Sequence, residues 1–373
     1  MIIVVMAALV VVGIFCSRVA HTPADQDATS QAEGSGGQSA SAPENRLARI
    51  RMPERTPNPA HPGGGEPGPE RIPPGEPQPT KLSAEEVEKF LQRNHRNATS
   101  LRTAFLVTVD TNYLNEAGAN FPGDSKVQLS VLLHGAPPEE RRKWLDAFKE
   151  SAPENSLANY LSAREYFNSG QADDGLKELI EATRRPLFQD YTMDSIQALD
   201  ELGRETGLPP WHSMTTAMAG WASEHMSELA LLKNLARDVG DLRKQYQTAG
   251  DSQSAENLSQ MALALAGRLN GGDESKFAIN HLVAISMESS ALGQLPPDTA
   301  FDFLGGKTPK DRADELRQQK EAIQSLTKGF QSAFFNSTES ERTAYAEKAR
   351  AEGELEAMRW ILQLRQAAQP GHE

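Results

Sequence analysis

The feature that most constrains how this chain folds is the spacing of three prolines. Pro122, Pro153 and Pro186 lie 31 and 33 residues apart, each in a short segment that would end a helix. Proline ends a helix because it lacks an amide hydrogen and its ring clashes with the preceding turn. A period of this length is typical of helical hairpins stacked in a row. The sequence therefore predicts an all-α domain of repeated hairpins, in which no β-strand is needed.

The hairpin domain begins at a helix-start signal near residue 82. In the segment Ser83-Ala84-Glu85-Glu86, the Ser83 side chain can accept a hydrogen bond from the Glu86 amide. The Glu86 carboxylate can reach back to the Ser83 amide, which completes a capping box. We therefore expect an α-helical repeat domain over residues 82–368, followed by a disordered tail at 369–373.

Two further start signals predict helices near the C-terminus. Thr308 is placed as an N-cap before Pro309, and Thr338 forms a second capping box with Glu341. Each predicted helix has apolar residues on one face: Leu316, Ile323 and Phe330 in the first, and Ala344, Ala351, Leu355, Met358 and Leu362 in the second. The strongest strand candidate, residues 104–109, continues without a turn signal into the next apolar residues, so we predict that it is helical.

The first twenty residues predict a membrane anchor. From Met1 to Cys16 every residue is apolar or glycine, which suits a signal anchor or a short transmembrane helix over residues 1–20. The first interpretation is an uncleaved single-pass anchor with the domain outside the cytoplasm, in the periplasm if the source is bacterial. Lipidation at Cys16 and secretion after cleavage are the alternatives. Arg18 follows the apolar run and, by the positive-inside rule, would instead hold the domain in the cytoplasm.

Residues 21–81 predict a disordered linker. Their first half is rich in Ala, Ser, Gly and Gln, and their second half is dense in proline. A Gly/Ser-rich chain is a flexible coil, whereas dense proline favours an extended polyproline II helix of about 3 Å per residue. We interpret this segment as a spacer that holds the domain away from the membrane. The alternative is that the proline-rich half is itself a ligand for another module.

The segment from Ser156 to Pro186 carries small, aromatic and turn residues at regular places. In order, these are Ala163, Tyr166, Gly170, Gly175, Leu176, Leu179 and Ala182. Small residues let two antiparallel helices approach closely, and Gly170 can take the backbone conformation of a tight turn. The pattern resembles the tetratricopeptide repeat (TPR) family, with Asn159 in place of the family's large aromatic and Gly175 in place of its alanine.

A fainter copy of the pattern spans Ala236 to Leu269. Four of its residues stand at the offsets of the first copy: Tyr246, Gly250, Ala255 and Ala262. The resemblance implies a TPR-like α-hairpin solenoid, whose stacked helices offer a concave surface to a protein or peptide. Between the copies lies a stretch rich in Met and Trp, residues 211–226, which is either a packing seam or an exposed peptide-binding face.

The resemblance also implies where a partner would bind. In TPR repeats the first helix lines the groove, at offsets that correspond here to Tyr160, Arg164 and Asn168. Their spacing of four places these side chains on one stripe of the helix. Arg164 could hold a partner carboxylate with two hydrogen bonds. The alternative is that Tyr160 packs against the preceding hairpin and Arg164 is only solvated.

The charge of the chain argues against nucleic acid as a partner. The formal net charge is −13, and residues 1–81 contribute only −1 of it, from 7 basic and 8 acidic residues, so −12 remains on the folded part. Binding to a phosphate backbone needs clustered Lys and Arg instead.

Catalytic and metal-binding motifs are not readable in this sequence. Its single cysteine, Cys16, lies in the apolar run, its histidines are scattered without an HExxH motif, and it has no GxSxG elbow or phosphate-binding loop. We therefore expect no metal and no cofactor, and a binding or scaffold module without catalysis. The alternative is a cell-envelope enzyme, such as a peptidoglycan-acting hydrolase, built on the same helices without a readable motif.

Overall fold

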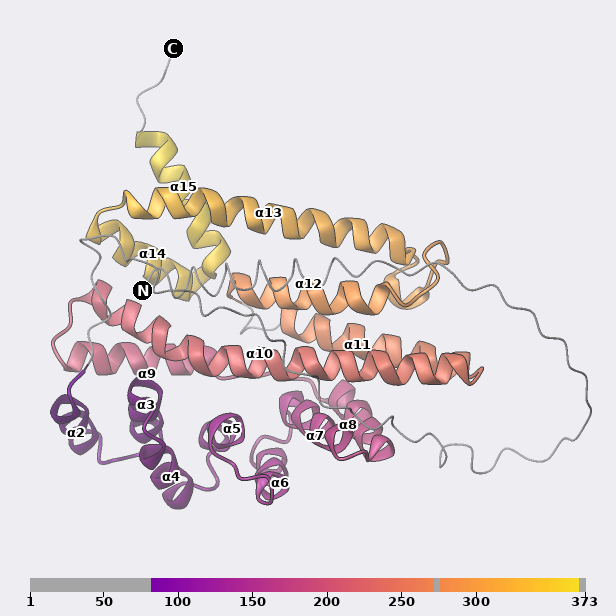
Figure 1. Ribbon diagram of the computed structural model, residues 1–373. Coiled ribbons are helices and arrows are strands. Elements are labelled where there is room, and N and C mark those ends of the chain that lie inside the picture. Colours follow the sequence, from indigo (N-terminus) through magenta and orange to yellow (C-terminus); the bar gives the residue numbers. More distant parts are fainter. Residues whose placement is uncertain (1–81, 272–275, 369–373) are drawn as a thin grey trace, which may run out of the picture.

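The computed structural model describes residues 82–271 and 276–368, and this part of the chain is all α (Figure 1). Over these residues there are 14 α-helices, a short 3₁₀ helix and no β-strand, which confirms the prediction that the domain is all α. The expected anchor, linker and C-terminal tail lie outside the described residues. Within the described ranges, no helix combines the length and the apolar character needed to cross a membrane.

Seven short helices make up about the first third of the described chain. They are α2 (Ala84–Arg93), α3 (Ala98–Thr108), α4 (Thr111–Asn120), α5 (Ser125–His134), α6 (Arg141–Ser151), α7 (Ser156–Asn168) and α8 (Ala172–Arg184). In Figure 1 they form a row, indigo to magenta, along one side of the long helix α10. Helices of 10 to 13 residues are marginal on their own, so their stability comes from packing against one another and against α10.

Longer helices form the next layers. They are α9 (Thr192–Glu205), α10 (Pro210–Thr248), α11 (Ser252–Gly271) and α12 (Ala278–Leu292). The 39-residue helix α10 contacts α3, α5, α7, α9, α11, α12 and α14, so it joins the row of short helices to the longer helices that follow. Trp211, Met214 and Trp221 of α10 are buried. The Met/Trp-rich stretch is therefore largely a packing seam.

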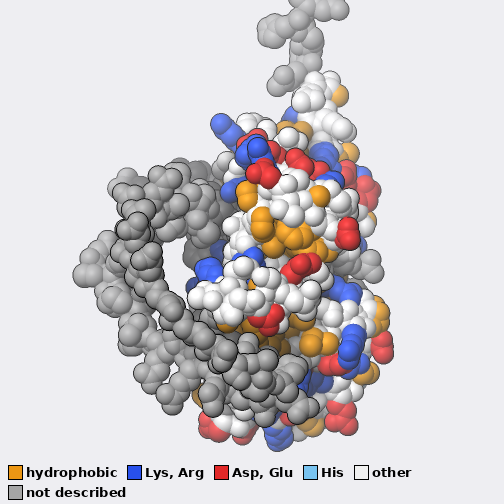
Figure 2. Space-filling view, turned by 90° about the vertical axis from the view of Figure 1, so that its right-hand side faces the viewer, with side chains coloured by type: hydrophobic (Ala, Val, Ile, Leu, Met, Phe, Trp, Pro, Cys, Tyr) orange, Lys and Arg blue, Asp and Glu red, His pale blue; other side chains and the backbone are white. Residues whose placement is uncertain are grey.

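The C-terminal helices cover the other side of α12. They are η2 (Asp302–Leu304), α13 (Pro309–Phe335), α14 (Glu339–Glu352) and α15 (Glu354–Ala368). The predicted capping boxes at Ser83 and Thr338 and the N-cap at Thr308 are all present, and the predicted apolar face of α13 is buried. Figure 2 shows the end of the molecule on the right of Figure 1, where charges of both signs surround hydrophobic side chains.

The two predicted hairpins have the same turn. Gly170 between α7 and α8 has φ +76°, and Gly250 between α10 and α11 has φ +80°. In each turn the residue after the glycine donates to the carbonyl of the tyrosine five residues earlier: Gln171 to Tyr166 and Asp251 to Tyr246, both at 2.9 Å. Positive φ favours glycine because it has no Cβ. Five of the remaining packing positions are buried (Ala163, Leu179, Ala182, Ala255 and Ala262), whereas Leu176 is half-buried.

Two helices predicted as continuous are each divided in two. Residues 104–109 are helical only as far as Thr108, because Val109 has φ +58° and Asp110 caps the separate helix α4. The predicted last helix breaks at Gly353, with φ +98°, into α14 and α15. At that break the Glu354 amide donates to the Lys276 carbonyl at 2.6 Å. The second break therefore lies at a contact with a residue that is distant in the sequence.

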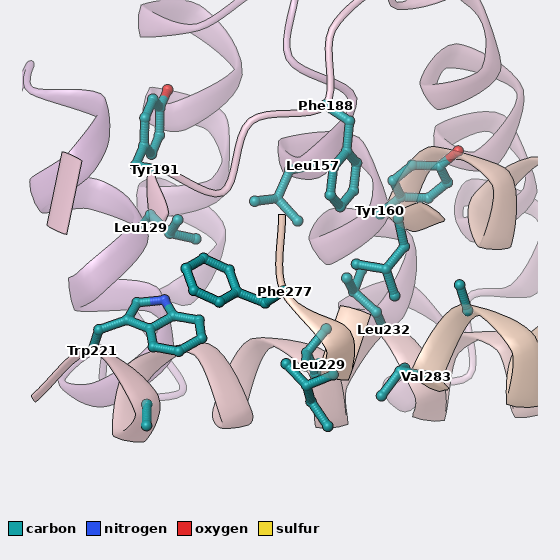
Figure 3. Packing of buried hydrophobic residues seen from close by; sticks show 14 of the residues in the cluster. Leu129, Leu157, Tyr160, Phe188, Tyr191, Trp221, Leu229, Leu232, Phe277 and Val283 are labelled. Atoms are coloured by element: carbon teal, nitrogen blue, oxygen red, sulfur yellow. The ribbon is translucent and has the colours of Figure 1, made fainter. Parts of the chain in front are cut away.

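The hydrophobic core lies where the row of short helices, the α8–α9 connection, α10 and α12 meet. Figure 3 shows residues from all of these segments in contact range: Leu129 of α5, Leu157 and Tyr160 of α7, Phe188 and Tyr191 of the connection, Trp221, Leu229 and Leu232 of α10, and Phe277 and Val283 at α12. Aromatic rings fill its centre, with Trp221 and Phe277 centroids 4.4 Å apart. The core therefore joins the row of short helices and the longer helices into one packed body.

Candidate functional site

The stripe predicted to face a partner is not arranged along an open groove. Tyr160 is 1% exposed, and its ring centroid lies 6.3 Å from that of Phe188. Arg164 forms an ion pair with Asp238 of α10 at 2.8 Å and also donates to Asn168. Of the three predicted residues, only Asn168 is exposed. The physical reason is that α10 runs past α7 and its Asp238 pairs with Arg164, a contact that the local pattern does not contain.

An open groove lies instead among the C-terminal helices. It has a volume of about 690 Å³ and is lined from α12, α13 and α15, with Asn270 contributed by α11. Its apolar lining consists of Ile285, Ala322, Ile323, Leu326, Leu355 and Leu362. A volume of this size is within the usual range for ligand sites, and an apolar wall between two helices is a common docking surface for a third.

The polar lining of the groove is neutral or basic. It consists of Asn270, His281, Gln319, Ser325 and Arg359. His281 Nδ1 and Asn270 Oδ1 lie 2.6 Å apart, and the half-exposed Arg359 pairs with Glu356 one turn earlier on α15. No carboxylate is among the lining residues, on a folded part whose formal charge is −12. The lining of the groove therefore carries no negative charge, although the folded part as a whole is acidic.

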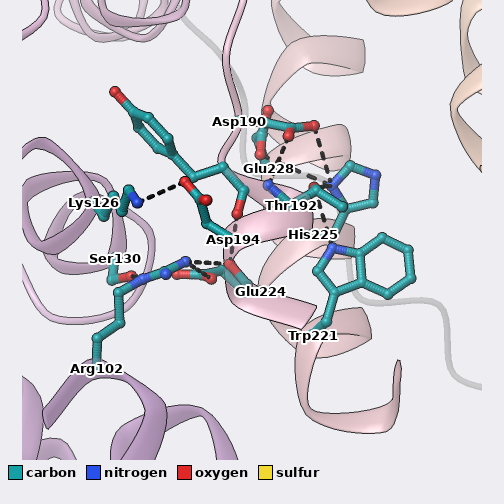
Figure 4. Close-up of polar contacts among 12 residues, drawn as sticks. Arg102, Lys126, Ser130, Asp190, Thr192, Asp194, Trp221, Glu224, His225 and Glu228 are labelled. Atoms are coloured by element: carbon teal, nitrogen blue, oxygen red, sulfur yellow. Dashed lines mark hydrogen bonds and ion pairs between the residues drawn. The ribbon is translucent and has the colours of Figure 1, made fainter. Parts of the chain in front are cut away.

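A second candidate region is a buried polar network on α10 (Figure 4). Glu224 pairs with Arg102 of α3 at 2.7 Å. Arg102 also donates to the hydroxyls of Ser130 and Ser195, at 2.7 and 2.6 Å, and Ser130 donates to Glu224. These hydrogen bonds satisfy both charges in the interior, which is what a buried ion pair requires. The network joins α3, α5, α9 and α10.

Beside this pair, one histidine and two carboxylates converge. Asp190 comes from the α8–α9 connection, and His225 and Glu228 lie one turn apart on α10. One ligand atom from each residue lies within 4.8 Å of the other two, and all three side chains are buried. Among the described residues, this is a set whose chemistry could hold a metal ion.

A buried carboxyl group also lies next to the groove. Glu354, which precedes the groove residue Leu355, is 4% exposed and accepts a hydrogen bond from the Ala278 amide at 2.8 Å. Burial raises the pKa of Glu354 to about 7, although the hydrogen bond from Ala278 opposes this shift. The carboxylate contacts the first turn of α12, where amides that have no partner within the helix favour negative charge.

Sequence reasoning missed both the groove and the converging trio. The groove depends on how α12, α13 and α15 stack, and no local pattern reports that arrangement. The trio did leave a partial signal, since His225-x-x-Glu228 on a helix places two ligand types on one face. Asp190, however, is 35 residues before His225, and only the folded α8–α9 connection brings it close.

No protein-family model matches this chain, and comparison with curated proteins and with solved structures gave no significant match.

Proposed function

We propose that this chain is a non-catalytic helical module that binds an amphipathic helix of a partner protein in the groove between α12, α13 and α15. The observation that carries the proposal is the apolar lining of this groove in an otherwise acidic domain. TPR-like stacking of the hairpins belongs to the same proposal, and the shared turn at Gly170 and Gly250 supports it.

The arrangement of the lining fits a helix as the occupant. Leu355 and Leu362 are seven residues apart on α15, and Ala322 and Leu326 are four apart on α13, so each pair lies on one side of its helix. A helix between them would pack its apolar face on Ile323 and Ile285, in the manner of helix-in-groove recognition. Arg359 at the rim favours an acidic residue on the polar edge of the partner.

The proposed location is outside the cytoplasm, tethered by the apolar run at residues 1–20. This part of the proposal rests on the sequence alone, because those residues lie outside the described ranges. A reporter fusion that is active only in the cytoplasm, joined after residue 81, tests it: activity would contradict the proposed orientation and favour the interpretation based on Arg18.

A catalytic role is less consistent with the geometry. A hydrolase needs acid, base or metal groups that a substrate can reach. The lining of the groove includes no carboxylate, and its one histidine, His281, is hydrogen-bonded to Asn270. The trio of Asp190, His225 and Glu228 is buried away from solvent. A binding function needs only the apolar surface and its rim.

A photo-crosslinking experiment tests the groove directly. A photoreactive amino acid replaces Gln319, which lines the groove, or Gln318, its exposed neighbour on α13, which does not. In membranes from the source organism, we expect a specific protein to be crosslinked from position 319 and not from 318. Equal crosslinking from both positions, or from neither, would show that the partner binds elsewhere.

A matched pair of substitutions then tests the contact. Ala322 is exposed and lines the groove, whereas Gln324 on the same helix is exposed outside it. We expect Ala322→Arg to weaken binding of the crosslinked partner at least about tenfold, and Gln324→Arg to leave it unchanged. Both proteins should keep the wild-type unfolding free energy within about 0.5 kcal/mol, since both changes are on the surface.

A further inference from the structure

The trio on α10 and the α8–α9 connection has the geometry of ligands around one ion. His225 Nδ1 lies 3.7 Å from Asp190 Oδ2 and 3.9 Å from Glu228 Oε2. Their side chains are 1%, 0% and 2% exposed, respectively. Two ligands on tetrahedral bonds of about 2.1 Å are about 3.4 Å apart. The two distances from His225 Nδ1 are a few tenths of an ångström longer than this, and all three ligand atoms lie within 4.8 Å of one another, so small shifts of the side chains would place them around one ion.

The orientation of His225 is set by its other ring nitrogen. Nε2 lies 2.5 Å from Oδ1 of Asn280, a buried residue of α12. Because an amide oxygen only accepts, Nε2 carries the hydrogen and Nδ1 faces the two carboxylates (Figure 4). A metal-binding histidine usually donates the N–H of its second ring nitrogen to an oxygen, as Nε2 does here, and the first nitrogen is left for the metal.

Neighbouring residues hold the trio in place. The Trp221 ring stacks on the His225 ring at 4.8 Å between centroids. Trp221 Nε1 donates to the Thr192 hydroxyl at 3.2 Å, and the Thr192 amide donates to Asp190 Oδ1 at 2.9 Å. The Thr192 hydroxyl itself lies 3.4 Å from His225 Nδ1. Both the histidine ring and the connection that carries Asp190 are therefore fixed by contacts outside the trio.

A histidinium ion held between two carboxylates is the competing arrangement. Charge-assisted N–H···O bonds are about 2.7–2.9 Å long, so the observed 3.7 and 3.9 Å are too long for them. The distances therefore favour the ligand arrangement.

We propose that Asp190, His225 and Glu228 bind one divalent transition-metal ion in a buried structural site, with Asn280 as a positioning residue. One imidazole with two carboxylates suits ions such as Zn²⁺ or Mn²⁺, whereas Mg²⁺ and Ca²⁺ prefer oxygen ligands alone. The ion joins the α8–α9 connection to α10, and so the row of short helices to the rest of the domain. Three protein ligands leave at least one coordination position open, but because all three side chains are buried we assign the ion a structural role.

Zinc titration of the full chain tests the proposal. The protein, free of affinity-tag histidines, is stripped with a chelator and titrated with Zn²⁺ by calorimetry. We expect one ion per chain and a higher unfolding temperature with Zn²⁺ than without it. Asp190→Asn and Glu228→Gln, which keep the side-chain shapes, should each weaken binding by about 100-fold or more, and Asn280→Leu by about 10- to 100-fold.

A control and a second measurement make the result decisive. His95 is exposed with φ +53°, a conformation that asparagine tolerates, so His95→Asn removes a histidine outside the trio and should bind Zn²⁺ like the wild type. If the trio variants fail to fold, histidine ¹⁵N spectra of the wild type still decide. We expect Zn²⁺ to shift His225 Nδ1 while Nε2 stays protonated. Unchanged spectra with both nitrogens protonated, no one-to-one binding, or full binding by Asp190→Asn and Glu228→Gln would overturn the proposal.

Discussion

Arg102 of α3 and Glu224 of α10 form an ion pair in which the side chains are 4% and 6% exposed and the charged atoms 2.7 Å apart. The pair lies at the junction between the short helices and the central helix, with Ser130 and Ser195 completing its hydrogen bonds. A buried pair of this kind adds little stability over an apolar one, but it is costly to break, because one charge is then left in the interior.

Replacing one partner of this pair is therefore expected to destabilise the folded protein strongly. Arg102→Leu should lower the free energy of unfolding by about 3–5 kcal/mol, because Glu224 loses its cation in a buried position. Urea denaturation measures this change. Lys126→Leu, at the partly exposed Lys126–Asp194 pair, is the control and should cost about 1 kcal/mol or less. Equal losses in the two variants would contradict the buried-pair assignment, and the double variant Arg102→Leu/Glu224→Leu should recover part of the loss.

Glycine is needed at position 175 because of the neighbouring Phe167 ring and not because of its backbone conformation. A Cβ built there would lie 2.7 Å from an atom of the Phe167 ring, which is 4% exposed. Gly267 on α11 has open space around it instead. We expect Gly175→Ala to lower the free energy of unfolding by about 1–3 kcal/mol through overpacking. Gly267→Ala should raise it by up to about 1 kcal/mol through helix propensity. Thermal and urea unfolding of both proteins check the opposite signs.

This glycine also explains a departure from the repeat pattern. Phe167 and Gly175 correspond to Gln247 and Ala255 in the second hairpin, 80 residues later. Where the large ring is present the facing residue is glycine, and where an exposed glutamine replaces it the facing residue is alanine. The offsets in the sequence identify these positions as equivalent. The steric reason for glycine at position 175 is visible only in the packed pair of helices.

Local signals predicted local structure well. The caps at Ser83, Thr308 and Thr338 and the turn glycines Gly170 and Gly250 depend on a few neighbouring residues, and each lies where the pattern predicted. Positions set by distant contacts were not predictable in the same way. The Glu354 amide beside the break at Gly353 pairs with the Lys276 carbonyl, and Arg164 pairs with Asp238 of α10.

Substitutions of Tyr160 test whether its side chain belongs to the core. Burial raises the pKa of its phenol to about 12, and its hydroxyl has no hydrogen-bond partner within the described part of the chain. Removing a buried unsatisfied group relieves a desolvation cost, so Tyr160→Phe should leave the free energy of unfolding unchanged or raise it by about 1 kcal/mol. Tyr160→Ala should lower it by about 3–5 kcal/mol through the cavity that remains. A large loss in Tyr160→Phe would show that the hydroxyl has a partner.

Glu354 should make stability depend on pH near neutrality. Its folded pKa of about 7 lies above its ordinary value of 4.5, so between these two values the folded state holds a proton that the unfolded state has released. Its contribution to stability is therefore fully present below about pH 4.5 and is lost as the pH rises through about 7. The shift corresponds to on the order of 3 kcal/mol at most.

Glu354→Gln isolates this effect, because the amide is neutral at every pH and its oxygen can still accept from the Ala278 amide. Relative to the wild type, the variant should unfold at higher urea concentration at pH 8, while the two curves should converge near pH 5. Other titrating groups cancel in the difference between the two proteins. Glu356→Gln, on the same helix but 54% exposed in its pair with Arg359, should follow the wild type at both pH values. A difference between Glu354→Gln and the wild type that stays constant from pH 5 to pH 8, or grows toward acid, would mean that this carboxyl group is not protonated in the folded protein.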